Sequence, residues 1–279
     1  MLMFPILLAA VSAVAFGTAD FSGGKASRRA NPVAVTVVSQ FLSVPLLLVL
    51  VLLVPGTPHP LDLAWGLFAG VAGAAGVMLL YRALSTGMMA VVAPVTAITA
   101  AVVPILAGLV TAHYPGTVAL GGAGLAVVAI ALVSLGESGG TGRVSRRVIG
   151  MALGAGLLFG VFFALLGQAD EDAGMWPVLA VRASSIAFGL AVAARIGVRL
   201  RIERRVLGWA AAAGLLDSAA NAFYLAAASR GHLSIVAAVA SLYPASTVLL
   251  ALAVDRERLR PVQLAGLGFA AGALVLASV

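Results

Sequence analysis

The stretch GLLDSAANAFYLAAASRG, residues 214–231, has the length and apolar composition of a membrane-spanning helix, but it contains three conspicuous polar side chains. Asp217 and Asn221 are one helical turn apart, and Tyr224 follows nearly one turn later. Side chains at this spacing lie on one face of a helix. Whether a carboxylate can occupy that face depends on what surrounds the chain, so the rest of the sequence decides how this stretch folds.

The composition indicates that the surroundings are a lipid bilayer. Of the 279 residues, 62% are hydrophobic and only 10% are charged, and the mean hydropathy is +1.12. Soluble globular domains carry about 25% charged residues. The chain has no cysteine, which excludes a disulfide framework, a thiolate metal site and a thiol nucleophile. We therefore expect an all-α integral membrane protein.

Ten apolar runs predict ten transmembrane helices, because a spanning helix needs about 20 mostly apolar residues. Turn residues or charges separate consecutive runs, and no soluble domain fits between them. The first run lacks the basic segment of a secretory signal, so we interpret it as a transmembrane helix. The predicted helices cover residues 4–23, 33–54, 63–83, 88–111, 116–135, 149–168, 177–194, 207–229, 233–254 and 262–278.

The basic residues indicate how the chain is oriented. If alternate loops share one side of the membrane, 15 of the 17 basic residues lie on that side, and only Arg182 and Arg230 do not. Because basic loops tend to remain in the cytoplasm, this bias predicts a multi-pass protein of the cytoplasmic (inner) membrane with both termini outside. The topology explains the net charge of +7, and we expect no nucleic-acid partner.

The two halves of the chain are related by a shift of 144 residues. We interpret the shift as a duplication, with repeats at 1–136 and 149–279 and a basic, glycine-rich linker at 137–148. Because each repeat holds five helices, an odd number, the second must enter the membrane upside down, as in the inverted repeats of secondary transporters. The shift pairs Trp65 with Trp209, Gly70 with Gly214, Ser85 with Ser229, Gly87 with Gly231, Gly122 with Gly266, Gly124 with Gly268 and Ser134 with Ser278.

Several phrases of the chain also carry a family resemblance. They are GTADFSGGKASRRA at 17–30, LLYRALSTG at 79–87 followed by VVAPVTAI, and SRGHLSIVAAVASLYPASTVLLAL at 229–252 followed by DRERLRPVQLAGLGFAAGALVL. In this order they resemble the EamA family of the drug/metabolite transporter superfamily. The resemblance implies a transporter, commonly an exporter, of amino acids, metabolites or drugs. Family members are usually drawn with cytosolic termini, whereas the charge bias of this chain predicts the reverse.

Asp217 is the leading candidate for a functional site. It lies about ten residues, or ~15 Å, into a helix that begins near Leu207, which places it at the bilayer midplane. A carboxylate there is costly unless it faces a wet cavity or a partner, so one hypothesis makes it the proton-coupling or substrate-amine site. Asn221, Tyr224 and Tyr243 would then orient the solute. The alternative is that Asp217 only joins two helices.

Two further charged residues lie within predicted helices. Asp20 either serves a cavity or a proton pathway, or pairs at a helix end with Lys25 or Arg28. Arg182 either snorkels outward or pairs with the acidic cluster at 170–172. In the alternative interpretation, Arg182 binds an anionic substrate group or pairs with Asp217.

Amides, prolines and threonines complete the candidate set as cavity-lining or hinge residues. The amides are equally compatible with interhelical hydrogen bonds. The prolines are predicted to interrupt corresponding helices of the two repeats, at a binding site, at a hinge or simply for packing. The threonines fall near the depth of Asp217. The set comprises Gln40, Gln168, Pro94, Pro104, Pro244, Thr96 and Thr99.

Three classes of function are compatible with a membrane protein of this kind. The sequence favours a secondary transporter that moves a small organic solute by alternating access, with or without proton coupling, and that functions as a monomer or a dimer. A channel or lipid-handling scaffold is the first alternative. We expect no enzyme, cofactor or metal site, because the three histidines are scattered, HExxH is absent, and no GxxxxGK[ST] nucleotide-binding motif occurs.

Overall fold

The fold is described from a computed structural model. It describes residues 3–110, 121, 124–125, 128–129, 131–132, 137–138, 142–143, 145–228, 239, 243–257 and 259–277. The described residues are predominantly helical, apart from a short antiparallel pairing of β1 (Glu137–Ser138) with β2 (Gly142–Arg143). Predictions for most of 116–135 and for 229–242 lie outside the described residues.

Short connections join consecutive helices within residues 3–110 and within residues 145–228. Five spans are long and apolar enough to cross a membrane, namely α1, α2 together with α3, α4, α7 and α8. This supports a multi-pass membrane protein, while the count of ten helices stays a prediction. The helices are α1 (Met3–Ser27), α2 (Pro32–Leu42), α3 (Val44–Leu53), α4 (Pro60–Thr86), α5 (Met89–Val110), α7 (Arg146–Leu166), α8 (Trp176–Arg195), α9 (Arg204–Ala228), α11 (Tyr243–Ala253) and α12 (Pro261–Ala277), with a 3-10 turn η1 (Glu171–Ala173).

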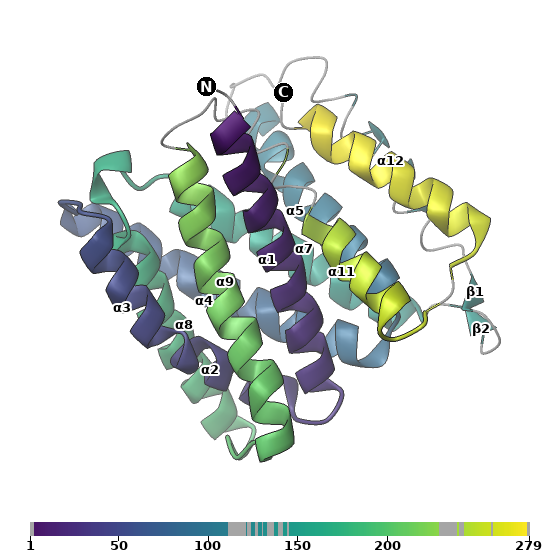
Figure 1. Ribbon diagram of the computed structural model, residues 1–279, viewed down its shortest axis with the longest axis horizontal. Coiled ribbons are helices and arrows are strands. Elements are labelled where there is room, and N and C mark those ends of the chain that lie inside the picture. Colours follow the sequence, from purple (N-terminus) through teal and green to yellow (C-terminus); the bar gives the residue numbers. More distant parts are fainter. Residues whose placement is uncertain are drawn as a thin grey trace.

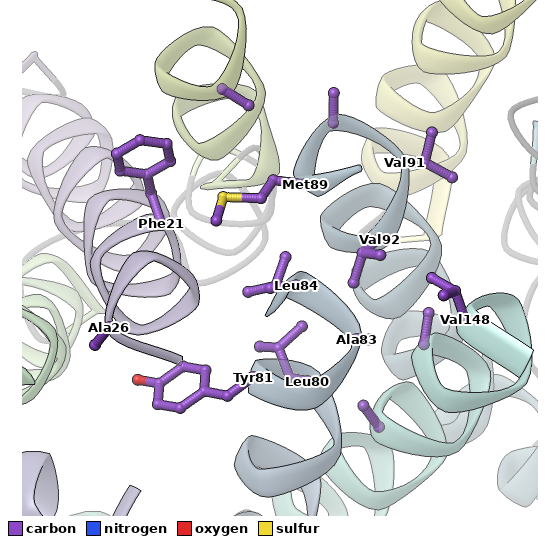
Figure 2. Packing of buried hydrophobic residues seen from close by; sticks show 14 of the residues in the cluster. Phe21, Ala26, Leu80, Tyr81, Ala83, Leu84, Met89, Val91, Val92 and Val148 are labelled. Carbon is purple, nitrogen blue, oxygen red and sulfur yellow. The ribbon is translucent and has the colours of Figure 1, made fainter. Parts of the chain in front are cut away.

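The helices form a bundle in which elements far apart in sequence are neighbours. The most extensive contacts join α1 to α9, α4 to both α7 and α8, and α5 to α7, and α1 begins on the side of the bundle where α12 ends (Figure 1). A buried apolar cluster occupies the junction of α1, α4 and α5, where Phe21, Leu84 and Met89 approach one another (Figure 2). Large apolar side chains such as Phe41 and Phe68, each 65% exposed, remain on the outside. Such an apolar exterior is what contact with lipid requires.

The helix predicted at 33–54 is bent rather than straight. Ser43 separates α2 from α3, with φ −84° and ψ −13°. Pro45 follows two residues later, and it has no N–H to donate to the Phe41 carbonyl one turn earlier. The hydroxyl of Ser43 donates to the carbonyl of Gln40 at 2.7 Å. Pro45 therefore marks the bend of this span.

The predicted interruption of a helix at Pro94 and Pro104 is wrong. α5 continues without a break from Met89 to Val110. Each proline removes a single backbone hydrogen bond, and a helix in a tightly packed bundle tolerates that loss. Pro244 lies in the first turn of α11, where a missing N–H costs little.

Gly70 and Gly214, which the 144-residue shift pairs, make equivalent contacts. A Cβ atom added to Gly70 of α4 would lie 2.3 Å from the carbonyl oxygen of Val181 in α8. A Cβ atom added to Gly214 of α9 would lie 1.9 Å from the carbonyl oxygen of Ser39 in α2. At both positions a hydrogen in place of a side chain lets two backbones meet, as is common for helices packed in lipid.

Asp62 joins two loops at the end of the bundle opposite the basic loops. Its carboxylate accepts the N–H of His59 at 2.8 Å, as part of a capping box at the start of α4, and the N–H of Asp170 at 3.0 Å. Thr57 N–H donates in turn to the Asp172 carbonyl at 3.0 Å. The loop before α4 is thus tied to the loop before α8.

We expect Asp62→Ala to lower the apparent melting temperature by about 3 °C, because two backbone donors lose their acceptor. Thermal unfolding of the purified protein in detergent measures this change. Asp172→Ala is the matched control, since its exposed side chain is the acceptor of neither N–H. Equal melting temperatures for the two variants would show that Asp62 does not hold these loops together.

Candidate functional site

The candidate site is centred on an ion pair between α8 and α9. Nη2 of Arg182 lies 2.9 Å from Oδ2 of Asp217 and 3.1 Å from the hydroxyl of Ser218. The guanidinium therefore binds two consecutive residues of α9. Of the interpretations left open for Arg182, the structure places it against Asp217, away from the acidic residues at 170–172. It does not snorkel outward, because its side chain is only 5% exposed.

The two partners of this ion pair differ in their surroundings. The Asp217 side chain is 38% exposed, whereas Arg182 is buried and its Nε has no hydrogen-bond partner in the described part of the chain. Burying a charge is costly unless it is paired, so Asp217 is what makes Arg182 tolerable at this depth. The Asp217 carboxylate therefore remains partly accessible to a further partner.

Asp20 and Tyr81 lie close to this ion pair. Asp20, on α1, interacts electrostatically with Asp217, and Tyr81, on α4, interacts with both carboxylates and with Arg182. The tyrosine ring packs directly on α1, since a Cβ atom at Gly23 would lie 2.1 Å from it. Its hydroxyl points toward α1 (Figure 2). Residues of α1, α4, α8 and α9 thus converge on one polar region.

The alternative role for Asp20, pairing with Lys25 or Arg28 at a helix end, is not found in the structure. α1 continues to Ser27, so Asp20 lies two turns inside the helix. Lys25 and Arg28 bind Asp255 instead. Asp20 itself has no ion-pair partner among the residues that the structure describes.

Asn221, Tyr224 and Tyr243 have different neighbours. The amide of Asn221 donates to the carbonyl of Asp217 at 2.8 Å and so reinforces its own helix. Tyr224 packs with Ala9 and Ala227, toward the start of α1. Tyr243 lies nearer the centre, because it interacts with Asp20, and its ring centroid is 6.2 Å from that of Phe16. Of these three side chains, Tyr243 is the one that interacts electrostatically with Asp20.

The threonines and amides are used mainly in packing. Thr96 donates to the carbonyl of Ala152 at 3.2 Å, and Thr99 donates to its own helix, both where α5 meets Gly156 of α7. Gln168 is exposed, and its amide donates to the Ala164 carbonyl at 3.4 Å, so the interhelical bond considered for it is not formed. Gln40 is buried, and its Oε1 has no partner among the described residues.

Pro94 and Pro244 line the same cavity. It has a volume of about 300 Å³, lies among α5, α11 and α12, and is lined by apolar residues that include Val248 and Leu267. These two prolines, which the sequence places in corresponding helices of the two repeats, therefore line one apolar cavity. None of the lining residues belongs to the ion pair, so this cavity is separate from the polar region. The side chain of Pro104 lies outside the described set.

Ser218 and Tyr81 are the site residues that the sequence analysis did not single out. Ser218 directly follows Asp217, and Tyr81 lies in the phrase LLYRALSTG, so both were adjacent to features already recognised. A serine beside an intramembrane carboxylate and a tyrosine within a long apolar run are the signals that point to them. Across the described segments, no three His, Asp or Glu side chains are grouped closely enough to hold a metal ion.

Comparison with known families gives one match. The model of the EamA-like transporter family matches residues 3–135 and again residues 146–279. Nearly the whole chain is therefore covered by two successive copies of the same family model. Among curated proteins, none matches this chain.

Proposed function

The chain belongs to the EamA-like transporter family, and we propose that it is a secondary transporter that exports a small organic solute by alternating access. The observation that carries this proposal is the Arg182–Asp217 ion pair, which lies within two apolar helices and has one partly exposed member. A carboxylate 38% exposed at this depth faces a space that water or a solute can enter, because lipid would not tolerate it.

The pattern of helix contacts supports two structurally equivalent halves. α1 packs on α9 as α7 packs on α4, α1 contacts α11 as α7 contacts α5, and α4 contacts α8 as α9 contacts α2. Exchanging the repeats 1–136 and 149–279 therefore maps each of these three contacts onto its counterpart. A twofold axis in the membrane plane produces an exchange of this kind. The contacts therefore support inverted repeats joined by the linker 137–148.

The two carboxylates have distinct proposed roles. Asp217 is held by Arg182 and Ser218, which fixes its position. Asp20 is beside Asp217 without a cationic partner among the described residues, so a proton or a substrate amine could neutralise it. We assign Asp217 to organising the site and Asp20 to binding the cation, with Tyr243 and Tyr81 orienting the solute. Proton coupling through this pair is the form of the mechanism that we favour.

The proposed setting is the cytoplasmic membrane, with basic loops in the cytoplasm, both termini outside and the bilayer as the surrounding solvent. A monomer already contains every element of the site that we describe. The alternative, a channel-like or lipid-handling scaffold, differs in one measurable respect. Flux through a carrier saturates with solute concentration, whereas flux through an open channel rises in proportion to it over a much wider range.

A thermal-shift screen of the purified protein tests whether the polar region binds solute. Amino acids, nucleobases, amines, sugars and common drugs are added in turn, and a ligand that binds the folded state raises the melting temperature. We expect a cationic or zwitterionic hit whose shift disappears in Asp20→Asn and in Asp217→Asn. A hit whose shift persists in both variants would show that solute binding requires neither carboxylate.

A further inference from the structure

An ionic cluster connects three helices at the end of the bundle where α1 ends and α5 begins, which we call the basic end. Lys25 and Arg28, at the end of α1, both bind the carboxylate of Asp255, which follows α11. Arg28 also binds Glu257, with Nη2 3.2 Å from Oε1. The side chains of Asp255 and Glu257 are only 6% and 9% exposed. Ion pairs this well shielded are screened less by salt than those on an open surface.

Glu257 extends the cluster to a third helix. Its two carboxylate oxygens accept the N–H groups of Met89 and Ala90, each at 3.0 Å, at the first turn of α5. The first N–H groups of a helix have no partner within the helix, and an anion there also interacts favourably with the helix dipole. One carboxylate thus ties the start of α5 to the end of α1 through Arg28.

The backbone between the two carboxylates is held in an unfavourable conformation. Arg256 has φ 53°, in the left-handed region that glycine usually occupies after a helix. The N–H of Glu257 donates to the Ala251 carbonyl at 3.2 Å, which closes the end of α11. A non-glycine residue adopts this conformation at a cost, so the contacts of Asp255 and Glu257 on either side of it must compensate.

The other half of the chain does not repeat this chemistry. The shift of 144 residues that relates the halves brings Glu257 onto position 113, which is a histidine, and Asp255 onto position 111, which is a threonine. Lys25 and Arg28 likewise correspond to Ala169 and Asp172. The carboxylates and cations of the cluster therefore belong to one end of the protein.

We propose that Lys25, Arg28, Asp255 and Glu257 form a one-sided clasp that keeps the basic end closed in the resting protein. The clasp rests on the proposed alternating-access function, in which α1 and α5 must separate at this end when the pathway opens to that side. Because the positions that the shift relates to these four residues do not carry the same charges, the two closed ends differ in stability. The basic end is therefore closed in the resting protein. It opens when the free energy of solute binding compensates for breaking the ion pairs of the clasp.

Cysteine labelling measures this opening without any transport assay. The chain has no cysteine, so one introduced at Met89 is unique. Met89 is fully buried, and its Cε would lie 2.8 Å from a Cβ atom on Gly24, so it reports on the α1–α5 contact. The reaction rate of Met89→Cys with a water-soluble maleimide is compared with and without Glu257→Gln or Arg28→Gln. Glu203→Gln is the matched control, since Glu203 is an exposed carboxylate at the same end.

We expect Glu257→Gln and Arg28→Gln to raise the labelling rate about tenfold, and Glu203→Gln to leave it unchanged, since tenfold in an opening equilibrium corresponds to about 1.4 kcal/mol. Ser185→Cys, a buried reporter at the α4–α8 contact, should label equally slowly in every background. If Glu257→Gln speeds the labelling of both reporters, that substitution has loosened the whole fold. The labelling rates in Arg28→Gln then test the clasp. Unchanged labelling of Met89→Cys, or equal exposure of both reporters in Arg28→Gln, would overturn the clasp.

The same variants distinguish a failure of the clasp from a failure of the proposed function. Flux in proteoliposomes with unchanged labelling would remove the clasp and leave the transporter assignment in place. Increased labelling in a protein that moves no solute would keep the clasp as a conformational lock and remove the transporter assignment.

Discussion

Asp217→Ala is expected to abolish transport and to destabilise the protein by about 3 kcal/mol. Removing one member of a buried ion pair leaves the other charge unpaired, and such changes cost about 3–5 kcal/mol. We take the lower end because Asp217 is 38% exposed, while Arg182 is 5% exposed and, among the described residues, keeps only Ser218 as a hydrogen-bond partner. For a chain of this size the apparent melting temperature should fall by roughly 6 °C or more. Thermal unfolding in detergent and flux in proteoliposomes measure the two effects.

Two related variants separate structure from function. Asp217→Asn keeps an oxygen that can accept from Arg182, so its melting temperature should fall less while transport is still lost. The neutral pair Arg182→Gln with Asp217→Asn removes the unpaired charge and should recover stability relative to Asp217→Ala, without recovering transport. If Asp217→Ala melts and transports like the unmodified protein, the ion pair is neither structural nor functional.

Gly214→Ala is expected to have the second large effect, on folding. The added Cβ atom would lie 1.9 Å from the backbone oxygen of Ser39, and backbone cannot move aside as a flexible side chain can. The α9 and α2 helices must separate, and overpacking of this kind costs about 1–3 kcal/mol or more. We expect a low yield of folded protein and an early, broad elution in size-exclusion chromatography.

Gly208→Ala is the matched control for this substitution. It lies on the same helix, but its added Cβ atom would have no described atom of another helix within 4 Å. Alanine is favoured over glycine in a helix interior by about 1 kcal/mol, so this variant should be neutral or slightly more stable. Equal yields for Gly214→Ala and Gly208→Ala would show that α9 and α2 are not in close contact at Gly214.

The starts of several helices could be predicted because proline marks them. α2 and α12 begin at Pro32 and Pro261, where the sequence placed them within one residue. The end of α1 was predicted at residue 23, four residues before its observed end at Ser27, because glycines and charges commonly signal a loop. In the structure, Gly23 and Gly24 are helical, and Tyr81 and Met89 occupy the space that a side chain at either position would need. That requirement comes from other helices and cannot be read locally.

The position of Asp217 within a helix could be predicted, but its partners could not. The spacing within 214–231 placed Asp217 inside a span, and Arg182 was one of its possible partners. Depth along a helix does not define which way the side chain points, so a residue 35 positions away could not be selected. Glu257 was missed for a related reason. A carboxylate in a basic loop resembles a solvated charge, and the N–H groups that it binds are 167 and 168 residues away.

The central claim is that the polar region around Asp217 belongs to a carrier, and solute efflux tests it most directly. Proteoliposomes are loaded with a defined mixture of amino acids, amines, nucleosides and organic acids, and mass spectrometry follows what leaves. We expect protein-dependent loss of at least one compound, with a rate that saturates with its internal concentration and falls to that of protein-free liposomes in Asp217→Asn. Loss that rises in proportion to concentration, or that Asp217→Asn leaves unchanged, would contradict the account.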